Sequence, residues 1–139
     1  MSSTSHRPEL DLLRRQVADL AHQLAERDRV LHEQTHHLEV AQALAHLGSW
    51  NWDIASGEVE WSNELYRIFG YEPRSRAITF DSFMSAVLPD DHDRVLAAID
   101  DALAGAATYD MECRIVRPDG DVRTIHCCGE VVRDSSGQP

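Results

Sequence analysis

Three side chains near the C-terminus have the residue types and spacing for a redox or metal site. Cys113 precedes, and His126 and Cys128 follow, the turn signal Pro118–Asp121, and the segments on both sides of it alternate between apolar and polar residues. If Asp119-Gly120 forms a two-residue loop, Cys113 lies opposite His126 and shares a face with Cys128. A loop one residue longer would place these side chains on opposite faces. We therefore keep a soft-metal or redox site as a hypothesis, and favour a sheet face filled by small cysteines with a hydrogen-bonded histidine.

Catalytic motifs give little support for an enzyme. The sequence contains no GxSxG pattern, no phosphate-binding loop and no CxxC pair. His32 and His36 stand four residues apart in the segment HEQTH, which fits HExxH, but no further ligand is evident and we favour a solvated polar helix face over a metal site. Asp90 and Asp91 are adjacent, and we interpret them as acids that stabilise the start of a helix. We expect a protein that is not an enzyme, with three free thiols and no metal.

Composition narrows the class of partner. The net charge is −11, and no lysine is present. Residues 1–45 carry seven acids against five arginines, and residues 46–139 carry seventeen against eight. Without a basic surface, neither nucleic acid nor an anionic membrane is an expected partner. The N-terminus has no signal-peptide pattern and no apolar run is long enough for a bilayer span, so we expect a cytoplasmic protein.

Residues 1–45 predict a long amphipathic helix. Residues 8–45 contain no glycine, and apolar side chains repeat every three and a half residues over about five heptads. Two seam positions are polar, Arg27 and Gln34. The pattern predicts a coiled-coil homodimer, with a helix folded back onto the rest of the chain as the alternative. The predicted seam consists of Leu10, Leu13, Val17, Leu20, Leu24, Leu31 and Leu38.

After Gly48, apolar side chains recur at every second residue. Alternating residues predict a hairpin over 48–61, and Ser62 then caps a short helix that ends at Gly70. Two more helices are expected over 79–88 and 89–104, and alternation over 109–117 and 122–132 predicts a second hairpin. The sequence therefore predicts an α+β domain over residues 46–139, preceded by a helical segment over residues 1–45.

Three segments in this order resemble a PAS domain. They read GSWNWDIASGEVEWSNELYRIFGYEP, FMSAVLPDDHDRVLAAIDDAL and YDMECRIVRPDGDVRTIHCCGEVVRDSSGQP. The resemblance implies an antiparallel sheet flanked by short helices, used for sensing and dimerisation in signalling proteins such as histidine kinases. It also implies a last strand in the middle of the sheet, which these residues lack. We expect either a fragment of a longer receptor or another segment in that slot.

The resemblance also implies a pocket between sheet and helices. No cofactor is predicted: the Asn-Cys-Arg motif of the flavin photoreceptor branch is missing, and His92, the one helical histidine of the domain, is a weak haem candidate. The same apolar residues equally well make a filled core. The candidate lining consists of Leu65, Phe69, Phe83, Val87, Val95, Ile99, Met111 and Ile115.

The sequence thus predicts a sensory and dimerisation module of a cytoplasmic signalling protein of the two-component type. It would relay a signal through the coiled coil to a downstream domain such as a histidine kinase. Trp50 and Trp52 are expected to anchor the domain to the end of the helix and to join the dimer interface. The alternative is a redox or gas sensor that carries haem, flavin or a metal.

Overall fold

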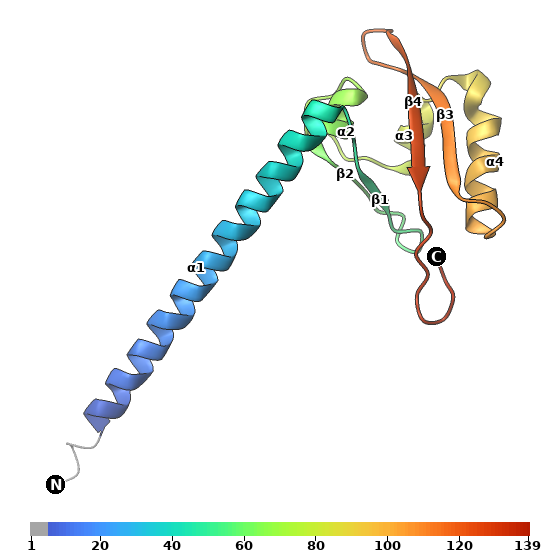
Figure 1. Ribbon diagram of the computed structural model, residues 1–139. Coiled ribbons are helices and arrows are strands. Elements are labelled where there is room, and N and C mark those ends of the chain that lie inside the picture. The colour runs from blue at the N-terminus through green and yellow to red at the C-terminus, as the bar shows by residue number, and fades with distance from the viewer. Residues whose placement is uncertain (1–5) are drawn as a thin grey trace. The chain divides into compact units, whose positions relative to one another are not determined.

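The computed structural model describes residues 6–139 (Figure 1). It confirms the predicted α+β fold, with one long helix followed by short antiparallel sheets and small helices. The chain divides into two compact units after Ala41. No helix among residues 6–139 has both the length and the apolar character that a membrane span requires.

The first element is the continuous helix α1, His6–Ala45. Its length follows from the absence of glycine, and Pro8 lies in the first turn, where no backbone donor is needed. The helix ends in a left-handed turn at His46, whose φ is 52°. The Leu47 amide then donates to the Gln42 carbonyl over 2.9 Å, which satisfies an otherwise free carbonyl of the last turn.

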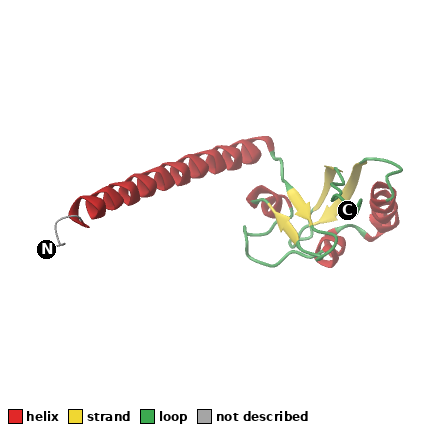
Figure 2. Cartoon of the chain, turned by 90° about the horizontal axis from the view of Figure 1, so that it is seen from below, coloured by secondary structure: helices red, strands yellow, loops and turns green. Residues whose placement is uncertain are grey.

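A tight hairpin opens the second unit. Strand β1, Trp50–Trp52, pairs antiparallel with β2, Val59–Trp61, so that Trp50 lies opposite Trp61. The Asp53 carboxylate accepts hydrogen bonds from two amides of the connecting turn. The hairpin prediction is confirmed, with shorter strands than the sequence indicated (Figure 2).

Three helices follow. Ser62 caps α2, Asn63–Ile68, by accepting a hydrogen bond from the Leu65 amide. Thr79 and Ser82 form a reciprocal capping box at the start of α3. The remaining bounds are Phe80–Ala86 for α3, Pro89–Asp91 for the 3-10 turn η1, and His92–Leu103 for α4.

The second hairpin pairs β3, Tyr109–Val116, with β4, Val122–Gly129. Its loop holds three residues, because the Arg117 amide bonds the Asp121 carbonyl over 2.8 Å. Gly120 occupies the left-handed position of this loop, at φ 85°, where a side chain would be strained. The two-residue loop of the sequence prediction is therefore wrong, and the register shifts by one residue.

The two hairpins form two separate two-stranded sheets among the described residues. Strand β1 pairs only with β2, and β4 pairs only with β3, in the part of the chain that is described. Strand β4 ends at Gly129, three residues before the predicted end. Each hairpin therefore keeps an edge without a strand partner.

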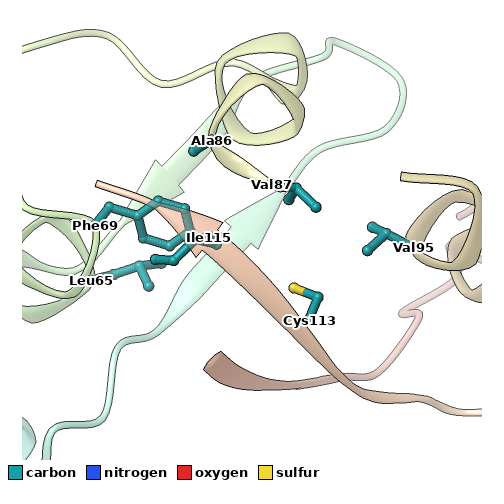
Figure 3. Close-up of a cluster of buried hydrophobic side chains, with 7 residues drawn as sticks. All are labelled: Leu65, Phe69, Ala86, Val87, Val95, Cys113 and Ile115. Atoms are coloured by element: carbon teal, nitrogen blue, oxygen red, sulfur yellow. The ribbon is translucent and has the colours of Figure 1, made fainter. Parts of the chain in front are cut away.

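A small core holds the second unit together. Its buried side chains come from α2, α3, α4 and β3, together with Phe69 and Val87, which directly follow α2 and α3 (Figure 3). A single β-bridge between Val87 and Ile115 ties the end of α3 to β3. The core consists of Leu65, Phe69, Ala86, Val87, Val95, Cys113 and Ile115.

Candidate functional site

The second unit contains a cavity of about 580 Å³. Residues of both hairpins line it, together with residues of α2, α3, α4 and the segment after β4. Seven of these lining residues are aromatic, which favours an apolar or planar occupant. They are Trp50, Trp52, Trp61, Phe69, Phe80, Phe83 and Tyr109.

The structure divides the predicted pocket residues into two groups. Leu65, Phe69, Phe83 and Ile99 line the cavity. Three others, Val87, Val95 and Ile115, are fully buried side chains of the core, and Met111 packs against that core. Sequence reasoning missed the aromatic rings of β1 and of Phe80, because their approach to the cavity depends on contacts between segments far apart in the chain.

The two tryptophans of β1 reach across to other elements. The Trp50 ring meets Tyr109 edge to face, with centroids 6.0 Å apart, and lies over Gly129. The Trp52 ring stacks on Phe80 at 4.9 Å. These contacts lie inside the domain.

The end of α1 is held by other side chains. Gln42 Nε2 donates to Ser49 Oγ over 3.1 Å, and His46 Nδ1 lies 3.6 Å from the Glu64 carboxylate. The expected role of Trp50 and Trp52 as anchors of the helix end stays a prediction.

The candidate Cys–His set is split by the observed register. Cys113 lies opposite Ile125, while His126 lies opposite Glu112. The side chain of Cys113 is buried, and those of His126 and Cys128 are exposed. The predicted opposition of Cys113 and His126 is wrong, because the longer loop moves every residue of β4 by one position.

The exposed face of the second hairpin carries an ion pair instead. His126 Nε2 donates to Asp110 Oδ1 at 2.5 Å. This hydrogen bond and the charge of Asp110 raise the pKa of His126 above 6.5. Among residues 6–139, no group of three or more His, Cys, Asp or Glu side chains is arranged to hold a metal ion.

Asp91 has a role that its position at a helix start did not indicate. Its side chain is 3 % exposed, and it accepts hydrogen bonds from the backbone amide, Nε and Nη2 of Arg114 at 2.7 to 3.1 Å. These hydrogen bonds hold the pKa of Asp91 far below its usual range. Asp91 therefore fixes the start of α4 against β3, and no motif in the sequence links it to Arg114, twenty-three residues away.

His92, the candidate haem ligand, forms a hydrogen bond within the domain. His92 Nε2 donates to the Val87 carbonyl over 2.8 Å at the start of α4, and the ring is partly buried. His92 is not among the residues that line the cavity.

Comparisons with known proteins agree on one family. The family described as PAS fold matches residues 58–139. The chain is 24% identical to the sensor protein FixL of Bradyrhizobium diazoefficiens over 91 residues, which is 66% of this chain and 18% of that protein. It is 27% identical to a blue-light-activated histidine kinase of Brucella anthropi over 88 residues, 63% of this chain and 18% of that kinase. The chain thus spans about a fifth of the length of these curated relatives.

Solved structures show the same similarity. A sensory box histidine kinase/response regulator from Burkholderia thailandensis is 34% identical, with a TM-score of 0.62 over 73% of this chain and 76% of that one. The N-terminal domain of a diguanylate cyclase with a PAS/PAC sensor from Marinobacter aquaeolei shares the fold at 19% identity, with a TM-score of 0.58 over 66% of this chain and 84% of that chain.

Proposed function

Because this chain belongs to the PAS fold family, we propose that it is the sensory and dimerisation module of a cytoplasmic signalling protein. In this proposal two copies pair through α1, and the pair passes a signal to a downstream histidine kinase. Its curated relatives include sensor proteins and histidine kinases, which supports a role in signalling.

The observation that carries the proposal is the exposed apolar stripe of α1. Every predicted seam residue has half or more of its surface exposed in the single chain. The stripe repeats every three and a half residues along a helix of about 60 Å, the length given by a rise of 1.5 Å per residue. A helix with such a stripe is stabilised when a second apolar surface covers the stripe and removes it from water.

Charge complementarity favours a second copy of the chain as the occupant. In a parallel pair, the heptad position of Glu9 faces the heptad position of Arg14 in the other copy, and the reverse holds by symmetry. An antiparallel pair that aligns Leu10 with Ala41 brings Glu9 opposite Leu44, so the attraction is lost. We therefore propose a parallel pair.

Sizing in solution tests the dimer. Sedimentation equilibrium of the full chain is expected to give twice the monomer mass of 15.7 kDa, with dissociation on dilution. A monomer at all concentrations, as expected for a helix that folds back on its own domain, would contradict the proposal. The visible absorption spectrum of the same sample tests the alternative of a haem or flavin sensor, which would be coloured as purified.

A pair of chimeric kinases that differ in the heptad phase of α1 tests whether the helix relays a signal to a kinase. The matched segment of the Burkholderia thailandensis histidine kinase is replaced by residues 6–139, once in heptad phase and once with one residue added within α1, after Ala41. We expect autophosphorylation in the first chimera and an altered rate in the second, because one residue rotates a helix by about 100°. Equal rates would show that α1 does not transmit rotation.

A further inference from the structure

The lining of the cavity carries charge of one sign only. Two charged residues line it, Asp53 and Glu130, and both are exposed acids. Within residues 6–139, neither an arginine nor a histidine lines the cavity, and the sequence contains no lysine. An occupant therefore meets carboxylates where the cavity opens to solvent, and no positive side chain.

The aromatic rings of the cavity form a connected wall. Ring centroids lie 4.9 Å apart for Trp52 and Phe80, and 6.4 Å apart for Phe80 and Phe83. The contacts continue from Phe83 to Phe69 at 6.2 Å and from Phe69 to Trp61 at 4.5 Å. Because the face of an aromatic ring is the negative part of its quadrupole, such a wall attracts a cation. The rings and the carboxylates thus favour the same sign of charge in an occupant.

Several arginines of the second unit are engaged away from the cavity. Arg94 and Arg114 both contact the Asp91 carboxylate, and Arg133 donates to the Leu103 carbonyl. A phosphate or carboxylate group in the cavity would therefore lack an opposing charge, which is costly away from bulk water. A cofactor that bears such groups, as flavin nucleotides and haem do, does not fit this lining.

We propose that the cavity binds a small organic cation with a planar and mostly apolar body, such as an N-alkylated heteroaromatic ring. The body packs against the aromatic wall, and the positive charge interacts with the ring faces and with the carboxylates of Asp53 and Glu130. A volume of about 580 Å³ is ordinary for a site that binds a small molecule. The inference rests on the proposed function only in treating the occupant as a signal, because binding does not require that α1 pairs.

Equilibrium dialysis of the full chain against three quinoline derivatives of similar size tests the preference for charge. They are the cation N-methylquinolinium, the neutral compound lepidine and the anion cinchoninate, in a mildly alkaline buffer that keeps lepidine uncharged. We expect N-methylquinolinium to bind about tenfold more tightly than lepidine, because contact between a cation and aromatic rings contributes a factor of about two to thirty. We expect no binding of cinchoninate. Equal or tighter binding of lepidine, binding of cinchoninate, or no binding of N-methylquinolinium would each overturn the proposal.

A double variant, Asp53→Asn with Glu130→Gln, removes both charges and keeps the size of the side chains. The asparagine oxygen can still accept the two amide hydrogen bonds that Asp53 accepts in its turn. We expect the affinity for N-methylquinolinium to fall by about two- to thirtyfold, and the affinity for lepidine to stay unchanged.

Glu60→Gln is the matched control, because it removes the same charge from β2 at a residue that does not line the cavity. We expect it to bind both compounds like the wild type. An equal loss of affinity for both compounds in the double variant, or an equal effect of the control, would contradict the proposed role of the two carboxylates.

Sizing of the same samples separates this inference from the proposed function. A chain that stays monomeric but prefers N-methylquinolinium would support the ligand class and contradict the dimer. A chain that forms a dimer but shows no preference for the cation would support the dimer and overturn the ligand class.

Discussion

A charge placed at the centre of the α1 stripe should separate the proposed dimer. Leu24 lies midway along the seam and is 60 % exposed in the single chain. Replacing it by glutamate keeps the helix, because leucine and glutamate have similar helix propensities. The change therefore acts on association.

The magnitude follows from the exposed part of the side chain. Full burial of a leucine contributes about 1.5 to 3 kcal/mol, so the exposed three-fifths of Leu24 offers about 1 to 2 kcal/mol per chain. Two chains lose about 2 to 4 kcal/mol when both leucines are replaced, before the cost of an unpaired charge is added. This loss corresponds to a rise of about 30- to 700-fold in the dimer dissociation constant.

Sedimentation equilibrium over a dilution series measures this constant. Ala25→Glu is the matched control, because it adds the same charge one residue further along, off the seam. We expect the control to associate like the wild type within a few-fold. An unchanged dissociation constant for Leu24→Glu, or an equal shift for both variants, would refute the assignment of the seam.

Three further predictions concern the second unit. The pKa of Asp91 is lowered in the folded state, so its charge contributes stability above about pH 4, and this contribution is lost as pH falls. The Asp91→Asn variant should therefore melt at a lower temperature than the wild type at neutral pH, and the difference should shrink in acid. The raised pKa of His126 has the opposite effect: its pairing with Asp110 contributes its full stability below pH 6.5, and this stability is lost as pH rises through the folded-state pKa. The melting temperature of His126→Gln should therefore decline less over that pH range than the melting temperature of the wild type. An identical dependence of the two melting temperatures on pH would contradict the pairing. A methyl group on Gly129 would lie 2.7 Å from the Trp50 ring, so Gly129→Ala should lower the free energy of unfolding by about 1 to 3 kcal/mol in urea titrations, and by clearly less in a Trp50→Leu background.

Local patterns allowed correct prediction of elements and fold. The absence of glycine and the repeat of Leu10 to Leu38 predicted one continuous helix, because helix formation depends on neighbours three and four residues away. The change of period after Gly48 and the cap at Ser62 predicted the first hairpin and the helix after it. These signals are local, and the structure follows them.

The candidate site depended on features with no local signal. A three-residue loop ending in Gly120 and a two-residue loop are both compatible with the turn signal, and only one register pairs the strands as observed. The bond between Asp91 and Arg114, and the stacking of Trp52 on Phe80, join segments that are far apart in the sequence. Such pairings depend on how the elements pack together, which the spacing of residues along the chain does not encode.

All three tryptophans of the chain line a single cavity, and none lies elsewhere. The tryptophan fluorescence of the unlabelled protein, excited where tyrosine does not absorb, therefore comes entirely from the walls of that space. An occupant that displaces water or quenches an indole will change the emission wavelength or intensity without a background from distant fluorophores. A library of small molecules can be screened against the native chain by this emission alone, before the identity of its physiological signal is known.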